Sequence, residues 1–121
     1  MSDNGEQSDL AMLRDRLRAF AEERDWEQFH SPKNLSMALM VEVAELMEHF
    51  QWLSETESAE LSEETHQAVA EELADCLLYL VRLSDRLGVD LKDAALRKLE
   101  KNAQKYPADR VRGSSKKYSE Y

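Results

Sequence analysis

The sequence predicts an all-α fold. Only two prolines and three glycines interrupt 121 residues, and 34% of the residues are charged, a balance that favours helices over a sheet. Apolar residues return every three or four positions, whereas the two-residue alternation of a half-buried strand is absent. A chain of this length forms one domain. We therefore expect a four-helix-bundle-like domain built from four main helices.

The first two helices are indicated by their caps and apolar faces. Residues 1–8 are polar, and we expect them to be disordered. A helix over about residues 9–23 follows, with its apolar side chains on one face. Ser31 and Pro32 form a good N-cap and first turn for a second helix that continues to about Leu53. Apolar residues cover most of the circumference of that helix. Burial on most sides is hard to arrange in a small monomer, so we expect an oligomer.

Two further helices follow. A short polar link over residues 54–61 leads to Ser62, which can cap a third helix. Gly88 suits the left-handed position just after the last turn of that helix. Asp90 can cap a fourth helix, which runs to about Lys105 and is stopped by the proline two positions later. The four helices together account for most of the chain.

Charge divides the chain into an acidic body and a basic tail. The net charge is −9, yet residues 108–121 hold four basic and two acidic side chains, and we expect a flexible tail there after a helical domain over residues 9–107. An acidic body lacks the basic stripe that would neutralise the phosphates of a nucleic-acid polymer. No apolar run reaches the ~20 residues of a membrane span, and no signal peptide is recognisable. We expect a soluble, cytoplasmic protein without a membrane partner.

Two acidic pairs predict a metal site. Glu42 and Glu45, and likewise Glu72 and Asp75, stand three residues apart on an expected helix, so both members of a pair lie on one face. Other acidic pairs share this spacing, but these two fall on or beside apolar stripes, where an unpaired carboxylate costs several kcal/mol. A set made only of carboxylates suits Mg²⁺ or Mn²⁺ better than Zn²⁺. The alternative is that they are solvated or salt-bridged acids.

Polar residues on the fourth helix complete the candidate site. Lys98, Asn102 and Lys105 continue the helix face that begins with Leu91, so they should point inward, with Tyr106 beside them. Inward lysines near inward carboxylates can be simple salt bridges. Two lysines, an amide and a phenol also suit an oligophosphate whose charge is partly neutralised by a metal. We therefore expect phosphates and a divalent metal to share one cleft.

Several short motifs resemble those of a known family. They are R-D-W-E-Q-F-H at 24–30, E-V-A-E-L at 42–46, F-Q-W at 50–52, E-E-L-A-D at 71–75 and K-Y-P at 105–107. Together they resemble the MazG-like nucleoside triphosphate pyrophosphohydrolases over roughly residues 10–120, and within that superfamily the dCTP pyrophosphatase branch. The resemblance implies the all-α MazG-type fold. It also implies a homotetramer, built as a dimer of dimers, with active sites where protomers meet.

The same resemblance implies a reaction. The residues that match the metal-binding positions are Glu42, Glu45, Glu72 and Asp75. Bound Mg²⁺ would position a water for attack at the α-phosphorus of a nucleoside triphosphate, giving a nucleoside monophosphate and pyrophosphate. Glu45 lies on the flank of its helix face, and it is our candidate for the base that accepts the proton of the water. The implied substrate is dCTP or a 5-modified dCTP.

Further residues match substrate contacts of the family. The positions that hold the phosphates are matched by Lys98, Asn102, Lys105 and Tyr106. Tyr79 matches a position that faces the sugar, where a packed ring could disfavour a 2′-hydroxyl. Trp26, His30 and Trp52 match positions that form the base pocket in the family. Aromatic faces and a neutral imidazole suit a pyrimidine. A purely structural role is the alternative for these three residues.

Three positions depart from the family pattern and leave the base open. Val41 and Ala44 stand where glycines are common, and His49 replaces an aliphatic residue. The same chemistry on dUTP or on a damaged nucleotide is therefore one alternative. A non-catalytic helical adaptor is another. A di-iron bundle would need Glu-x-x-His motifs that project inward. Glu63 precedes His66 in this way, but outside the apolar face of its expected helix.

Overall fold

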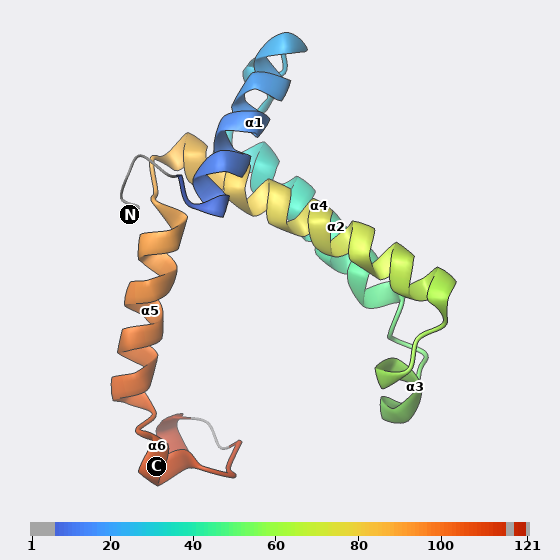
Figure 1. Ribbon diagram of the computed structural model, residues 1–121, viewed down its shortest axis with the longest axis vertical. Coiled ribbons are helices and arrows are strands. Elements are labelled where there is room, and N and C mark those ends of the chain that lie inside the picture. Colours follow the sequence, from blue (N-terminus) through green and yellow to red (C-terminus); the bar gives the residue numbers. More distant parts are fainter. Residues whose placement is uncertain (1–6, 116–117, 121) are drawn as a thin grey trace. The chain divides into compact units, whose positions relative to one another are not determined.

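The structure, a computed structural model, is all-α over the residues that it describes, 7–115 and 118–120 (Figure 1). Its α-helices and 3-10 helices (η) follow one another as α1 (Asp9–Glu23), η1 (Glu27–Phe29), α2 (Pro32–Glu48), α3 (Glu55–Ala59), α4 (Glu63–Leu87), α5 (Leu91–Lys105), α6 (Ala108–Val111) and η2 (Tyr118–Glu120). No strand occurs in the described ranges, so the predicted fold class is confirmed. The disorder expected for residues 1–8 falls almost wholly outside these ranges.

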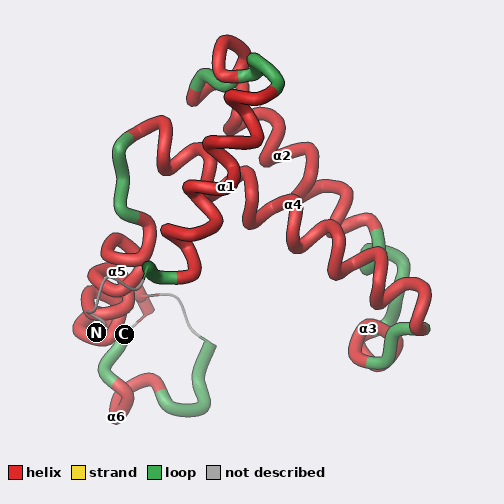
Figure 2. Tube along the Cα trace, turned by 45° about the horizontal axis from the view of Figure 1, so that its top comes forward, coloured by secondary structure: helices red, strands yellow, loops and turns green. Residues whose placement is uncertain are grey.

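The chain divides into two compact units, Met1–Val89 and Asp90–Tyr121. In the first unit α4, the longest helix with 25 residues, lies alongside α2 and also packs on α1 (Figure 2). The second unit holds α5, α6 and η2, so the stretch expected to be a flexible tail begins with a short helix. Every helix within residues 7–115 and 118–120 is too short or too polar to span a membrane.

Local capping fixes both ends of α4 and the start of α5, as predicted. The side chain of Ser62 accepts a hydrogen bond from the backbone N–H of Thr65 (3.2 Å). Gly88, the residue after α4, has a φ of 70°, a left-handed conformation that glycine adopts without the steric cost of a Cβ atom. The side chain of Asp90 accepts a hydrogen bond from the backbone N–H of Asp93 (2.9 Å). These caps fix where α4 begins and ends and where α5 begins.

The second helix is shorter than predicted. α2 ends at Glu48 rather than near Leu53. The backbone N–H groups of Phe50 and Gln51 both donate to the carbonyl of Met47 (2.9 and 3.0 Å), so the chain closes into turns instead of continuing the helix. The apolar pattern that suggested a longer helix continues through these turns. Apolar periodicity therefore did not locate the helix end.

The link expected over residues 54–61 contains a short helix. The Ser54 side chain accepts a hydrogen bond from the backbone N–H of Glu57 (3.1 Å). In return the Glu57 carboxylate accepts a hydrogen bond from the backbone N–H of Ser54 (2.8 Å), which completes a capping box. This reciprocal pair stabilises the first turn of α3. The S-x-x-E signal was present in the sequence, but five residues are too few to show apolar periodicity.

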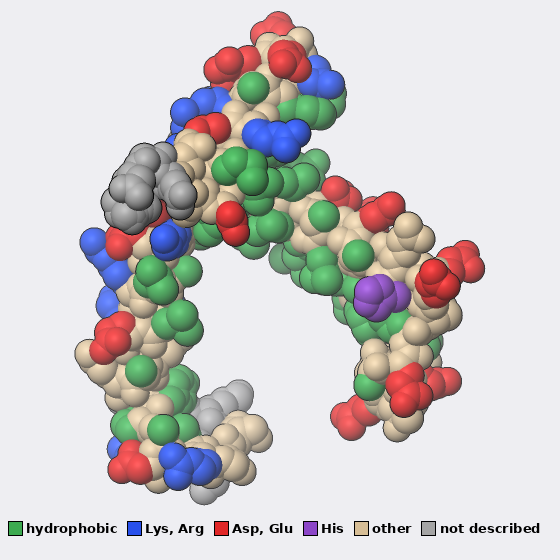
Figure 3. All heavy atoms as spheres, in the orientation of Figure 1, with side chains coloured by type: hydrophobic (Ala, Val, Ile, Leu, Met, Phe, Trp, Pro, Cys, Tyr) green, Lys and Arg blue, Asp and Glu red, His purple; other side chains and the backbone are tan. Residues whose placement is uncertain are grey.

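The first unit has a small core and large exposed apolar surfaces. The buried apolar residues are Ala21, Leu35, Val69 and Val81. Apolar side chains gather along the α2 and α4 pair on the face shown in Figure 3. The exposed large apolar residues on these two helices include Met37, Met40, Val41, Val43, Met47, Leu73, Leu77, Leu80 and Leu87. Monomeric proteins rarely expose apolar patches on this scale. One copy of the chain thus does not bury α2 on most sides, and the oligomer stays a prediction.

Candidate functional site

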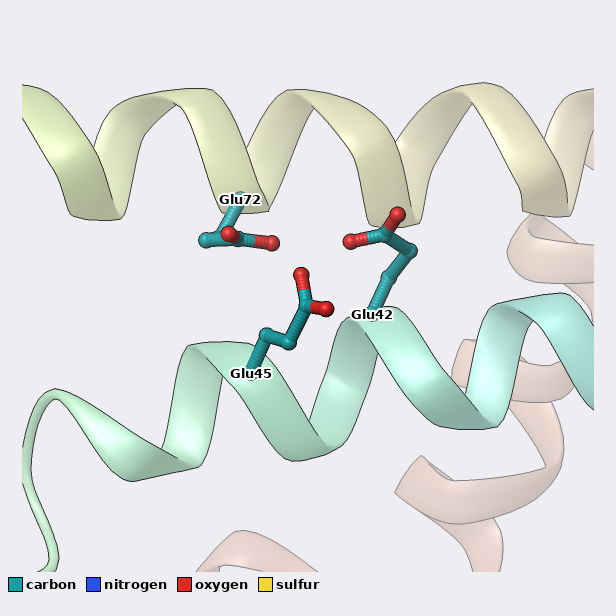
Figure 4. Close-up of side chains that lie close together, drawn as sticks. All are labelled: Glu42, Glu45 and Glu72. Carbon is teal, nitrogen blue, oxygen red and sulfur yellow. The ribbon is translucent and has the colours of Figure 1, made fainter.

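Three carboxylates meet where α2 and α4 face each other. Figure 4 shows Glu42 and Glu45 extending from α2 toward Glu72 of α4. One carboxylate oxygen of each residue lies within 4.8 Å of the others. The i,i+3 spacing places Glu42 and Glu45 on one face of α2, and the pairing of α2 with α4 brings Glu72 to that face. The structure thus brings together three of the four predicted metal ligands.

This carboxylate cluster is electrostatically incomplete. One oxygen of Glu42 and one of Glu72, Oε2 in both cases, are buried and receive no hydrogen bond within the described residues. Burial, the hydrogen bonds with Glu72 and Glu45, and the charges of Glu45 and Asp75 raise the pKa of Glu42 to about 7. A buried carboxylate without a proton donor needs a proton or a cation. The cluster offers only oxygen ligands, so it fits a hard divalent ion.

Asp75, the fourth predicted ligand, lies one turn further along α4. It is not among the three residues whose oxygens converge. Its charge nevertheless contributes to the raised pKa of Glu42, and, with those of Glu42 and Glu72, to that of Cys76, whose pKa is raised mainly by burial. Asp75 also lines a neighbouring cavity. The residue therefore connects the carboxylate cluster with that cavity.

The cavity has a volume of about 420 Å³ and is bounded by α1, the η1 turn, α2 and α4. Its lining residues are Leu13, Arg16, Leu17, Phe20, Trp26, His30, Leu35, Asp75, Leu78, Tyr79 and Arg82. Trp26, His30 and Tyr79, three of the four residues predicted to contact base or sugar, are in this set. The Trp26 ring lies edge-on to Phe20 and to His30, with centroids 5.7 and 6.4 Å apart. Their contact with a nucleotide stays a prediction.

Trp52 is the predicted base-pocket residue that does not line the cavity. It lies in the turn after α2 and its side chain is 86% exposed. α2 begins beside the cavity, where Leu35 lines it, and Trp52 lies beyond the other end of that helix. Within one copy of the chain, Trp52 and His30 therefore do not share a pocket.

The residues predicted to hold phosphates belong to the second unit. Lys98, Asn102 and Lys105 lie on α5, and Tyr106 is its C-cap. Asn102 and Tyr106 are half-buried, whereas the two lysines are exposed. The Lys105 ammonium lies 5.6 Å from the centroid of the Tyr106 ring. That these four residues bind phosphates stays a prediction. That they lie near the carboxylates of Glu42, Glu45 and Glu72 also stays a prediction.

Sequence reasoning missed the arginines that line the cavity, above all Arg82. This side chain is 4% exposed and donates a hydrogen bond to the His30 ring. A signal was available, because Arg82 follows Tyr79 by three positions and Asp75 by seven, which places all three on one face of α4. A cation on the same face as predicted substrate contacts was itself a candidate for the site.

The fold is all-α, and carboxylates converge between two of its helices. Both features agree with the MazG-like pyrophosphohydrolases that the sequence motifs resemble. The sequence model of the MazG-like family matches residues 37–121, and the chain belongs to that family. The resemblance inferred from the motifs is thereby confirmed.

Named relatives narrow the comparison. The chain is 51% identical to dCTP pyrophosphatase 1 of Homo sapiens and 50% identical to that of Mus musculus, over 103 residues in each case. The match covers 84% of this chain but 61% of each relative, so the chain spans about three fifths of their length. A crystal structure of a pyrophosphatase from Archaeoglobus fulgidus matches with a TM-score of 0.79 and 42% identity, covering 86% of this chain and 97% of the other.

Proposed function

We propose that this protein is a metal-dependent nucleoside triphosphate pyrophosphohydrolase that converts dCTP, or a 5-modified dCTP, into the nucleoside monophosphate and pyrophosphate. The observation that carries the proposal is the cluster of Glu42, Glu45 and Glu72 beside a cavity with aromatic walls. In this cluster one buried oxygen of Glu42 and one of Glu72 receive no hydrogen bond from the described residues. The names of the relatives, dCTP pyrophosphatase 1 and pyrophosphatase, support the reaction class and the base.

The carboxylates would hold the metal. Glu42, Glu45, Glu72 and Asp75 supply oxygen ligands suited to Mg²⁺, for which Mn²⁺ could substitute. When bound, the metal lowers the pKa of a water and neutralises charge on phosphoryl oxygens. Glu45 is exposed, whereas Glu42 and Glu72 are half-buried, so Glu45 is the member of the cluster that can best accept a proton from water.

Other residues would bind and orient the substrate. The phosphate contacts are assigned to Lys98, Asn102, Lys105 and Tyr106, whose charged and polar groups suit an oligophosphate. Tyr79 lies one turn beyond Asp75 and lines the cavity with it, a position consistent with a contact to the sugar. Trp26 and His30 line the same cavity and are assigned to the base.

Trp52 and the exposed apolar surfaces support an oligomeric active site. We assign the assembly as a homotetramer, a dimer of dimers with sites between protomers. An exposed Trp52 could then complete the base pocket of a neighbouring copy, and the apolar faces of α2 and α4 would be covered. Light scattering should accordingly give a mass of roughly four times the 14.0 kDa of one chain. A monomeric mass would contradict this part of the proposal.

The direct test is pyrophosphate release from a panel of canonical and modified nucleoside triphosphates, with and without Mg²⁺. The native chain should hydrolyse dCTP or a 5-modified dCTP only with the metal. Glu42→Gln should lower kcat/KM by about a hundredfold or more, because changing even the outer partners of metal ligands costs about 10- to 100-fold. Glu48→Gln, an exposed glutamate on the same helix, is the matched control and should leave the rate unchanged. No hydrolysis of any nucleotide by the native chain would refute the proposal.

A further inference from the structure

Arg82 is a buried cation directed at a residue of the cavity wall. Its Nε–H donates a hydrogen bond to Nδ1 of His30 (3.1 Å), although the two residues stand 52 positions apart in the sequence. One turn later on α4, Nε of Arg86 donates a hydrogen bond to the backbone carbonyl of His30 (3.1 Å). The ring and the backbone of His30 are therefore both held by α4. Neither arginine was assigned a role in the proposed reaction.

The contact between Arg82 and His30 fixes which ring nitrogen carries the proton. A guanidinium stays protonated in proteins and its Nε can only donate. Nδ1 of His30 must therefore offer its lone pair, which leaves the proton of the neutral ring on Nε2. Burial, together with the charges of Arg82 and Arg86, lowers the pKa of His30 against the opposing charge of Glu27. The ring is thus a neutral hydrogen-bond donor at pH 7.

Arg82 is itself held by acids from two elements. Its guanidinium lies 3.4 Å from Asp85 of α4 and 3.6 Å from Glu27 of η1. Asp85 in turn accepts two hydrogen bonds from Arg18 of α1, at 2.6 and 3.1 Å. This arrangement, the arginine network of Arg18, Glu27, Arg82 and Asp85, links three elements around the cavity. The other charged residues lining the cavity are Arg16 and Asp75.

We propose that Arg82 is a positioning residue for base recognition: it holds His30 as the Nε2–H tautomer, so that the cavity presents a fixed donor to an acceptor atom on the edge of a pyrimidine. The proposal rests on the proposed function. Every pyrimidine offers an acceptor at O2, and cytosine offers a second at N3, where uracil carries a proton. The Trp26 ring, edge-on to His30, supplies apolar surface beside this donor.

The first test measures the tautomer in the native chain and needs no substrate. Two-bond ¹⁵N–¹H spectra separate Nδ1–H from Nε2–H imidazoles, and His30→Gln identifies the signal of His30 among the three histidines. We expect the Nε2–H form at pH 7 and a pKa below the ordinary 6.5. A ring protonated on Nδ1, or a fully charged ring at pH 7, would overturn the proposal.

The second test separates the hydrogen bond from the charge of Arg82. In Arg82→Gln the side-chain amide nitrogen occupies the same position along the chain as Nε and can still donate, whereas Arg82→Met has a similar length and no donor. Both variants leave Asp85 and Glu27 without the cation. Arg82→Met should raise KM for dCTP about 2- to 10-fold relative to Arg82→Gln and leave kcat unchanged. The increase in KM is the cost of ordering the His30 ring, which Arg82→Met no longer holds.

Arg97→Met provides the control, because Arg97 is 78% exposed and pairs only with Asp93 on its own helix (3.0 Å) among the interactions of the described residues. Equal KM values for Arg82→Gln and Arg82→Met would overturn the proposal. If both variants fail to fold, the tautomer of His30 measured in the native chain still tests the proposal. If the native chain hydrolyses no nucleotide, the proposed function fails while the tautomer measurement remains valid, so the two failures are distinguishable.

Discussion

The helix α4 contributes to two charge clusters of opposite character. Near its middle Glu72 joins Glu42 and Glu45, three carboxylates with two buried oxygens that receive no hydrogen bond in the described residues. Near its C-terminal end, Asp85 and Arg82 belong to a network in which arginines and acids alternate at 2.6 to 3.6 Å. The carboxylates of the first cluster repel one another, whereas the charges of the second cluster compensate one another, although the buried Nη2 of Arg82 makes no hydrogen bond among the described residues.

This difference in charge assigns different roles to the two clusters: the carboxylate cluster binds a ligand, and the arginine network positions side chains. Like charges held together at partly buried positions lower stability unless a partner arrives, so the carboxylate cluster fits a bound cation. Opposite charges held together need no ligand, and breaking such a buried pair destabilises the fold. Neutralising one acid in each cluster should therefore have opposite consequences.

The largest effect is expected in the carboxylate cluster. Glu72→Gln removes a proposed metal ligand and should lower kcat/KM about a hundredfold or more. The melting temperature of the metal-free protein should stay the same or rise, because one repelling charge is gone. The exposed neighbour Glu71 provides the control, and Glu71→Gln should change neither quantity. A variant that is less stable without metal and still active would show that the cluster is structural.

The arginine network should respond in the opposite way. Asp85→Asn leaves Arg82 and Arg18 without their shared acid and should lower the free energy of unfolding by about 2 kcal/mol, less than for a fully buried pair because Arg18 is partly exposed. Asp93→Asn, which breaks an exposed i,i+4 pair, should cost less than about 0.5 kcal/mol. Urea unfolding of the two variants measures both values. Equal losses would mean that the network contributes no more than a surface pair.

The smallest effect concerns pH. The pKa of Glu42 is raised to about 7 from an ordinary 4.5, so its contribution to stability is present at low pH and is lost as the pH rises through 7. The lowered pKa of Asp85 acts well below this range, whereas the lowered pKa of His30 adds stability as the pH rises through the ordinary imidazole pKa of 6.5 and so opposes the Glu42 contribution. Between pH 6.5 and 8 the metal-free native chain should therefore lose a few degrees of melting temperature relative to Glu42→Gln, which keeps the His30 contribution.

Glu42→Gln isolates this contribution, because glutamine is neutral like the protonated carboxyl group. The variant should lose less melting temperature than the native chain over the same interval. A native melting temperature that falls no further than that of Glu42→Gln between pH 6.5 and 8 would contradict the raised pKa.

Local signals predicted much of the fold. Ser62, Gly88 and Asp90 act within four residues of the backbone groups that they cap, so the sequence alone placed the ends of α4 and the start of α5. The end of α2 at Glu48 was not predictable in this way, because apolar residues continue through the turns that follow. The short α3 was overlooked although its capping box could be recognised in the sequence.

The part of the candidate site whose residues share one helix face could be predicted from the sequence. The helical spacing and apolar surroundings of the two acidic pairs predicted four ligands, of which Glu42, Glu45 and Glu72 converge and Asp75 lies outside the cluster. The contact of Arg82 with His30 joins positions 52 residues apart, so no local pattern reveals it. Such long-range pairs depend on how α4 meets the η1 turn, which the sequence does not state.

The central claim is that the carboxylate cluster binds a divalent metal. Calorimetric titration of Mn²⁺ or Mg²⁺ into the native chain at pH 8, without nucleotide, tests it most directly, with Glu42→Gln and Glu48→Gln measured in parallel. We predict saturable binding to the native chain and to Glu48→Gln, together with a rise in melting temperature, and a loss of both in Glu42→Gln. No binding to the native chain, or equal binding to Glu42→Gln, would contradict the claim.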